Sequence, residues 1–324
     1  MVSLLFFYRE KLKSIKFILE RKKFNLKKSK VQIIKLTDLE KENILEAFPE
    51  GVVIFDLETT GLSALINNIL EIGAIKVTPE GLTTFKTLVN PEVEIPASNT
   101  AIHGITGDMV KDSPKIKEVL PKFMNFVGDL PLVAHNAQFD LGFITYDLHM
   151  LGLPFGNSDV YCTIRLSRLV FKDFPSHRLG NLAKQLNIPL ERAHRAEDDA
   201  FVCLKVLAQG FIKAAKNKKS ILKGSYLFNL QDFKNMEKFV LKDFHKPILR
   251  AIENNDILRI KYLGGSKKNK FRPIRPVGLL PLPQGHVLYA HCLESNLYKF
   301  YYLNKITDCQ QATEKDHKLW ESLS

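Results

Sequence analysis

The feature that most constrains this chain is a pair of acids that follows an apolar run. Residues 52–55 read Val-Val-Ile-Phe, as in a central strand of a sheet, and Asp56 and Glu58 come next. Because side chains alternate along a strand, acids spaced i, i+2 project on one side of it. Packed carboxylates repel each other unless a divalent cation lies between them. The pair indicates a metal site, although an exposed strand end with two solvated acids explains it equally well.

Residues 50–210 alternate between short apolar runs and helical patterns. Further strands are expected at 69–77, 82–89 and 132–134, and the first two are separated by the turn signal Thr-Pro-Glu-Gly. Helices are expected at 114–127, 136–151, 179–186 and 194–215. This alternation predicts a mixed α/β layered domain.

Two more acidic motifs follow in this region. Residues 132–140 read Leu-Val-Ala-His-Asn-Ala-Gln-Phe-Asp and place Asp140 at the start of a helix, where the helix dipole also favours an acid. In His-Arg-Ala-Glu-Asp-Asp, His194 precedes a helix and Asp199 lies one and a half turns inside it. A mobile imidazole beside a rigid carboxylate suits a general base next to a metal ligand. A dipole preference at the helix start explains the acids as well, and Asp198 is the main alternative to Asp199.

The order of the three motifs, D-x-E-T, H-N-A-x-F-D and H-x-A-x-x-D, resembles the DEDDh 3′→5′ exonuclease family over about residues 50–212. Within that family the likeness is to the proofreading (epsilon) subunits of bacterial DNA polymerase III. The segment Ala-Ile-His-Gly-Ile-Thr at 101–106 also resembles the family's loop between the first two motifs. The resemblance implies a ribonuclease H-like fold, in which helices flank a mixed central sheet.

The resemblance also implies roles for individual residues. Two divalent cations, Mg²⁺ or Mn²⁺, would be held by four carboxylates: Asp56, Glu58, Asp140 and Asp199. His194 would act with one cation on the attacking water, and the other cation would offset charge on the leaving 3′ oxygen. Contacts to the terminal nucleotide would come from Thr59, Leu62, His103 and Phe139. The family's spacing from the histidine favours Asp199 over Asp198.

A second, smaller unit is expected at 245–312, with a short helix followed by several strands. Its pattern resembles the WYL domain, a small barrel-like β module, with Leu-Tyr-Ala at 288–290 in place of the defining tripeptide. The resemblance implies contacts to nucleic acid from Arg272, Tyr289, Lys299 and Lys305. Lysines at two positions where arginine is usual lose the planar fork suited to phosphate. A purely structural appendage therefore remains an alternative, although the tyrosines among basic residues fit a stacking surface.

The charge of the chain predicts a polyanionic partner. Lys and Arg outnumber Asp and Glu by 47 to 35 over 324 residues, which gives a net charge of +12. Residues 1–30 carry ten Lys or Arg and two acids. Apolar residues recur among them at roughly helical spacing. This basic amphipathic arm could contact nucleic acid, contact a membrane, or only be solvated. A generally Lys-rich proteome would produce the same surplus of positive charge.

Cysteine usage and hydropathy bear on the compartment. The four cysteines form no C-x-x-C pair, so buried free thiols in a reducing compartment are expected. Neither a membrane-spanning run nor a secretory signal is expected, because the apolar residues 1–8 are too few and lie before the positive charge. These features predict a cytoplasmic, bacterial protein.

Together these observations predict a division of the chain and a function. The expected parts are a basic arm at 1–46, the exonuclease domain at 47–212, a basic linker at 213–244, the WYL-like domain at 245–312 and a tail at 313–324. The expected function is hydrolysis of DNA 3′ ends in proofreading or repair, in a complex with a polymerase or repair proteins or alone. An exonuclease that trims RNA and a non-catalytic nucleic-acid-binding regulator are the alternatives.

Overall fold

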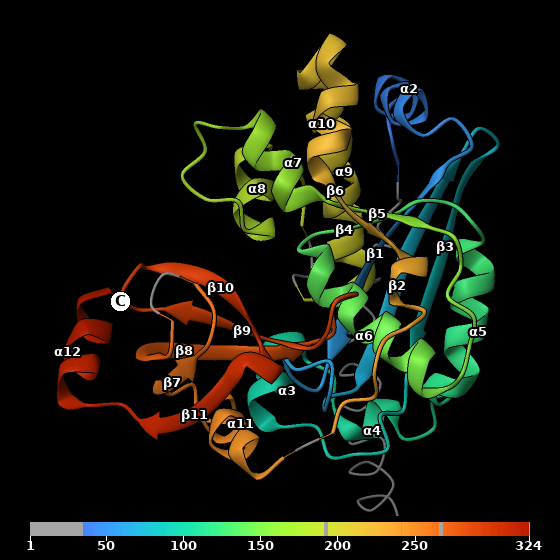
Figure 1. The fold of residues 1–324 in the computed structure, drawn as a ribbon. Helices are drawn as coiled ribbons and strands as arrows, with labels where there is room; N and C mark the ends of the chain where they lie inside the picture. The colour runs from blue at the N-terminus through green and yellow to red at the C-terminus, as the bar shows by residue number, and fades with distance from the viewer. Residues whose placement is uncertain (1–34, 191–193, 241, 266–267, 324) are drawn as a thin grey trace, which may run out of the picture. The chain divides into compact units, whose positions relative to one another are not determined.

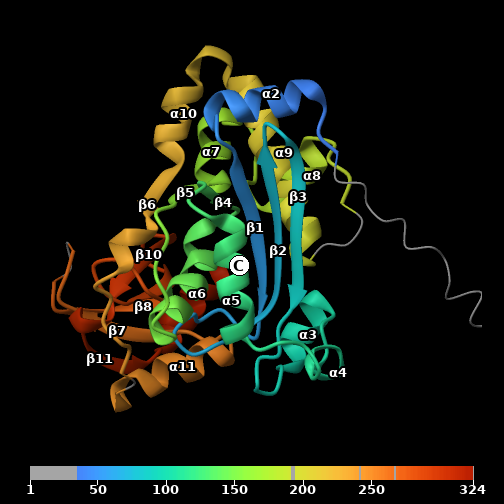
Figure 2. The ribbon, with the colours of Figure 1, turned by 90° about the vertical axis from the view of Figure 1, so that its right-hand side faces the viewer.

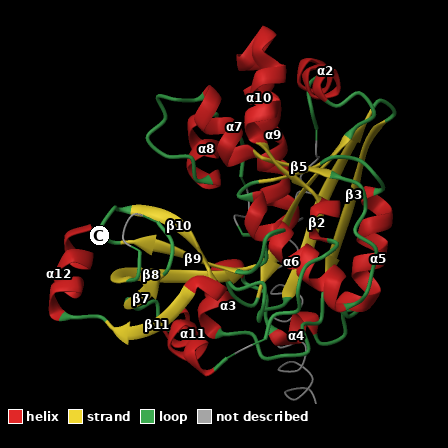
Figure 3. Cartoon of the chain, viewed as in Figure 1, coloured by secondary structure: helices red, strands yellow, loops and turns green. Residues whose placement is uncertain are grey.

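The structure is a computed structural model, and it describes residues 35–190, 194–240, 242–265 and 268–323. The basic helix predicted over the first thirty residues lies outside the described residues. Residues from Thr37 onward form one compact unit, which contains two β-sheets (Figures 1 and 3).

The first sheet has six strands in the order β3-β2-β1-β4-β5-β6. Its strands are β1 (Val52–Thr59), β2 (Ile69–Thr78), β3 (Gly81–Leu88), β4 (Leu132–Ala134), β5 (Asp159–Cys162) and β6 (Tyr226–Asn229). Strands β1, β4 and β5 run parallel, whereas β2, β3 and β6 pair antiparallel with their neighbours. The sheet is therefore mixed, as predicted, and the ribonuclease H-like architecture is confirmed.

The helices around this sheet include the four expected at 114–127, 136–151, 179–186 and 194–215. They are α2 (Asp38–Ala47), α3 (Ala97–His103), α4 (Gly107–Val110), α5 (Ile116–Val127), α6 (Ala137–Met150), α7 (Thr163–Val170), α8 (Leu179–Gln185), α9 (Ala196–Ala214) and α10 (Lys218–Ser225). Short 3₁₀ turns, η1 (Ala215–Asn217) and η2 (Leu230–Phe233), follow α9 and β6. The expected linker at 213–244 thus contains α10 and also β6, which pairs with β5 in the first sheet.

The two faces of β1 meet different helices, as Figure 2 shows for α5 and α6 on one side and α9 on the other. Val53, Phe55 and Leu57 belong to one core cluster with Phe123 of α5 and Ile144 of α6. Because side chains alternate along a strand, Asp56 and Glu58 face the opposite side, toward α9. The apolar run thus places its two acids on the α9 side of the sheet.

The second sheet has five antiparallel strands in the order β10-β9-β8-β7-β11. They are β7 (Leu258–Tyr262), β8 (Lys270–Leu280), β9 (Val287–Cys292), β10 (Leu297–Tyr302) and β11 (Ile306–Gln311). The region also contains η3 (Asp243–His245), α11 (Lys246–Glu253), η4 (Leu303–Lys305) and α12 (Glu314–Leu323), so the expected tail is helical. A β-rich C-terminal unit was expected, and the sheet confirms it, while its assignment as a WYL-like domain and the domain bounds stay predictions.

Strand β8 joins the second sheet to the loop that follows β1. A Cβ at Gly278 would lie 2.0 Å from the carbonyl oxygen of Leu62, so the two backbones are in direct contact. Next to it, the Leu279 amide donates to Ser63 Oγ at 3.1 Å. Leu280 and Val287 belong to the same apolar cluster as the first sheet's core. The two sheets therefore share buried surface beside the C-terminal end of β1.

Two further expectations can be compared with the structure. The four cysteines are free thiols, three of them buried and Cys309 half-buried. Within the described part of the chain, no helix combines the length and the apolar character needed to cross a bilayer.

Candidate active site

Strand β1 brings its two acids to the end of the sheet where β4 has already stopped. Strand β4 pairs with Val53 and Ile54 only, so the later part of β1 has no neighbour on that side within the sheet. Glu58 is buried, and Asp56 is half-buried. Both acids are thus held on a rigid strand in a site largely screened from water.

Asp140 occupies the space that β4 leaves. It lies in the first turn of α6, which begins after Asn136 in a left-handed conformation with φ of 65°. Its Oδ1 accepts a hydrogen bond at 3.3 Å from the backbone amide of Leu57, which lies between the two acids of β1. The second acidic motif therefore meets the first, although 83 positions separate Leu57 and Asp140.

The third motif closes the site from the α9 side. Side-chain atoms of Glu58, His194 and Asp199 lie within 4.8 Å of one another. The His194 amide donates to Asp199 Oδ2 at 3.2 Å, while the imidazole is exposed. His194 has φ of 61°, a left-handed conformation that turns the chain sharply before α9 begins. Asp198 is buried beside this group but is not part of it.

Burial, together with neighbouring negative charge, raises the pKa of all four carboxyl groups. Burial is the largest cause for Glu58, whose pKa rises to about 8, and the charges of Asp199 and Glu71 add to it. Burial also raises the pKa of Asp140 to about 8 and that of Asp199 to about 6. Asp56 has its pKa raised by burial and then by the charges of Asp140, Asp199 and Glu58.

This donor set fits divalent cations. Four carboxylates that disfavour one another's charge are stabilised when hard cations neutralise them, and carboxylate oxygen is the ligand that Mg²⁺ and Mn²⁺ prefer. The alternative interpretation from the sequence, an exposed strand end with solvated acids, does not hold for Glu58, which is only 8% exposed.

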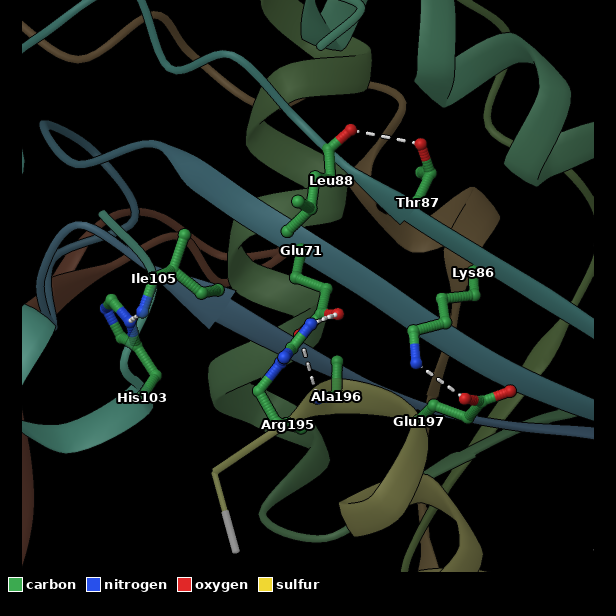
Figure 4. A network of polar contacts seen from close by, with 9 residues as sticks. All are labelled: Glu71, Lys86, Thr87, Leu88, His103, Ile105, Arg195, Ala196 and Glu197. Carbon is green, nitrogen blue, oxygen red and sulfur yellow. Dashed lines mark hydrogen bonds and ion pairs between the residues drawn. The ribbon is translucent and has the colours of Figure 1, made fainter. Parts of the chain in front are cut away.

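A buried ion pair that the sequence did not suggest fixes the start of α9 (Figure 4). Glu71 of β2 lies opposite Glu58 in the sheet register and is fully buried. Its carboxylate accepts from Arg195 Nε at 3.0 Å, from Arg195 Nη2 at 2.7 Å and from the Ala196 amide at 3.2 Å. Because Arg195 follows His194 directly, this pair positions the loop that carries the imidazole.

Two neighbouring contacts support the same helix start. Lys86 of β3 pairs with Glu197 at 2.7 Å, as Figure 4 also shows. A Cβ at Gly73 would lie 2.2 Å from the Glu197 amide nitrogen, so α9 can approach β2 this closely only at a glycine. The first turn of α9 is thus tied to two strands of the sheet.

The four residues expected to touch a terminal nucleotide separate into two pairs. Leu62, 49% exposed, and Phe139 line one cleft together. Thr59 and His103 are buried; burial lowers the pKa of His103, and Glu71 and the Thr59 backbone oppose this. His103 Nδ1 accepts from the Ile105 amide at 3.0 Å, so the neutral ring carries its proton on Nε2.

His135, the histidine of the second motif, has two partners away from the carboxylates. Its Nδ1 lies 2.9 Å from Thr163 Oγ1, and its Nε2 lies 3.0 Å from the His177 carbonyl oxygen. Burial lowers its pKa to about 4, so the ring is neutral at physiological pH. These contacts join β4 to α7 and favour the structural role.

The C-terminal residues expected to contact nucleic acid lie in different surroundings. Arg272 is buried, donates to the Gly264 carbonyl at 3.3 Å and lies over the Tyr262 and Tyr301 rings. Lys305 lies over the Tyr302 ring, and Lys299 is half-buried. Tyr289 lines the cleft that also contains Leu62 and Phe139.

Comparisons with known proteins find similarity to exonucleases and to DNA polymerases. Residues 53–207 match the family model described as Exonuclease (RNase_T). The chain is 37% identical over 264 residues to a protein named DNA polymerase III PolC-type from Clostridium perfringens, a match that covers 78% of this chain and 18% of that protein. The protein of the same name from Caldanaerobacter subterraneus subsp. tengcongensis is 43% identical over 178 residues, which cover 54% of this chain and 12% of that one.

A solved structure of exonuclease X with 5′-overhanging duplex DNA also matches, with 27% identity and a TM-score of 0.42. That match covers 53% of this chain and 99% of the other. The chain spans less than a fifth of the length of each of the two PolC-type relatives.

Proposed function

Because residues 53–207 form a domain of the exonuclease (RNase_T) family, we propose that this chain removes nucleotides from DNA 3′ ends by metal-dependent hydrolysis. The observation that carries the proposal is the meeting of Glu58, His194 and Asp199 within 4.8 Å, with Asp140 bonded to β1 beside them. DNA is the proposed substrate because the relatives above are named DNA polymerases.

In the proposed mechanism Asp56, Glu58, Asp140 and Asp199 hold two Mg²⁺ or Mn²⁺ ions. When bound, such ions stabilise negative charge on the attacking and leaving oxygens of a phosphoryl transfer. His194 takes a proton from the attacking water, whose oxygen forms a bond to phosphorus as the bond from phosphorus to the 3′ oxygen breaks. The products are a 5′-mononucleotide and a strand with a new 3′ hydroxyl.

The exposure of His194 suits this step, since the imidazole can exchange its proton with solvent after each turnover. Its backbone bond to Asp199 ties the base to a metal ligand. We propose a bacterial cytoplasmic setting, in replication or repair, from the names and organisms of the relatives.

The test is a degradation assay with 5′-labelled single-stranded DNA and RNA in Mg²⁺ or Mn²⁺. The wild type should produce a ladder of shortened DNA, and Asp56→Asn should abolish it. Asp129→Asn is the matched control, because this exposed acid precedes β4 and lies at the opposite end of the parallel strands. A ladder on RNA alone would replace DNA as the substrate, and no ladder on either polymer would refute the proposal.

A further inference from the structure

Four aromatic rings form a continuous surface on one face of β9 and β10, which we call the aromatic face. In the antiparallel register Tyr298 lies opposite His291, and Phe300 lies opposite Tyr289. Ring centroids are 4.9 Å apart for His291 and Tyr298, 5.4 Å for Tyr289 and Tyr298, and 5.1 Å for Tyr289 and Phe300. Tyr298 is 51% exposed and Phe300 is 40% exposed, which is unusual for large rings with only packing roles.

Three rings of the aromatic face, those of Tyr289, Tyr298 and Phe300, form one wall of a cleft of about 530 Å³ beside the candidate active site. The opposite wall belongs to the exonuclease domain, from the start of α6, from α7 and from β6. The residues that line the cleft and matter here are Leu62, Phe139, Arg165, Arg168, Tyr298 and Phe300. The volume lies within the range of sites that take ligands the size of a small molecule.

The charges of the cleft select its ligand. Among the residues that the structure describes, the lining includes two exposed arginines, Arg165 and Arg168, and no acid. Arg275 Nη2 donates to the Tyr298 hydroxyl at 3.3 Å and steadies that ring while its surface stays exposed. Stacked, exposed aromatic rings beside arginines are the combination that binds single strands without sequence preference, because bases stack and phosphates pair with cations.

We propose that this cleft binds the single-stranded nucleic acid immediately upstream of the 3′-terminal nucleotide. Bases stack on Tyr298 and Phe300, and the backbone phosphates pair with Arg165 and Arg168. This inference rests on the proposed function, in which the terminal nucleotide lies beside the carboxylates. The cleft reaches that position, because Leu62 and Phe139 line it and Asp140 follows Phe139 directly. The second sheet is thereby a part of the substrate site, and its contact with the Leu62 loop through Gly278 keeps the two walls together.

The stacking part is tested by equilibrium binding in an Asp56→Asn background, which leaves the strand intact. The probes are oligothymidylate and a strand of equal length that is abasic except for its 3′-terminal thymidine. The double variant Tyr298→Ala/Phe300→Ala should weaken oligothymidylate binding about tenfold or more and leave the abasic strand unchanged. Unchanged binding of oligothymidylate, or equal loss on both strands, would overturn the assignment.

Two further variants separate contacts from folding. Leu297→Ala removes an exposed side chain from the opposite face of β10 and should bind both strands like the parent. Arg168→Gln changes an exposed residue and should reduce the slope of log Kd against log salt by about 0.7 for one lost phosphate contact. A slope equal to that of the parent would remove Arg168 from the site.

Hydrolysis of the p-nitrophenyl ester of thymidine 5′-monophosphate distinguishes this inference from the proposed function, because that substrate has no upstream nucleotide. If the wild type cleaves neither this ester nor oligothymidylate, the proposed function fails while the binding result still stands. If it cleaves both, the double variant should lower the ratio of kcat/KM for oligothymidylate to that for the ester about tenfold. An unchanged ratio would count against the cleft.

Discussion

Asp198 and Asp199 are adjacent in the sequence, yet only the second lies with Glu58 and His194. Asp198 is buried near Arg195. The hydrogen bond to Glu71 is the largest cause of the raised pKa of Arg195, and the negative charge of Asp198 adds to it. The residues alone left the choice open, because both acids occupy the first turn of α9, and only the spacing implied by the family resemblance favoured Asp199. The direction of the side chains around the helix separates them.

This difference predicts opposite outcomes for two amide substitutions. Asp199→Asn should lower kcat on single-stranded DNA by at least about a hundredfold, because it removes a charge that holds the cation. Asp198→Asn should retain kcat within about tenfold. Steady-state kinetics over a Mg²⁺ titration, with melting curves for both variants, measure this. Greater loss from Asp198→Asn in a folded protein would reverse the assignment.

At the scale of elements, local patterns predicted the strands and helices that carry the acids. The apolar run before Asp56 became β1, and the helices expected at 136–151 and 194–215 are α6 and α9 within two residues at each end. Strand β6 was missed because its four residues lie in a lysine-rich stretch and pair only with the distant β5. The pair of Glu71 and Arg195 was missed for the same reason, since 124 positions separate them.

The anchor of α9 predicts a loss of activity without loss of the fold. Arg195→Lys keeps the charge but cannot reproduce the two-nitrogen contact with Glu71, so the His194 loop loses its fixed position. We expect kcat to fall about tenfold and the melting temperature by several degrees. Lys86→Gln, which breaks the more exposed pair with Glu197, should have little effect on either. Equal kcat values for the Arg195→Lys variant and the wild type would contradict a positioning role.

At the scale of the whole molecule, the contact between β8 and the loop after β1 joins the second sheet to the catalytic strand. Gly278→Ala would place a Cβ 2.0 Å from the Leu62 carbonyl oxygen, so the backbones must separate. Overpacking of this kind costs about 1–3 kcal/mol, which should lower the melting temperature by several degrees. Gly180→Ala in α8 meets no atom within 4 Å and should be neutral or slightly stabilising. Identical melting curves for Gly278→Ala and the wild type would show that the sheets are not in contact there.

The buried carboxylates make the stability of the whole protein depend on pH and metal. Glu58 has its pKa raised from 4.5 to about 8, and Asp140 from 3.8 to about 8, chiefly by burial. At pH values between the ordinary and the raised pKa of each group, the folded protein holds protons that the unfolded chain has released. The free energy of unfolding without metal should therefore fall as the pH rises through this window.

Divalent cations bind the deprotonated carboxylates of the folded protein, so they should restore more stability at about pH 8 than at about pH 5. Melting curves in EDTA and in excess Mg²⁺ at both pH values measure the difference. The Glu58→Gln variant should be less destabilised by alkaline pH and should gain less from Mg²⁺, because it cannot ionise at that position. A metal-free protein that becomes more stable toward pH 8, or a Mg²⁺ gain equal at both pH values, would show that these carboxylates are already ionised without the cation.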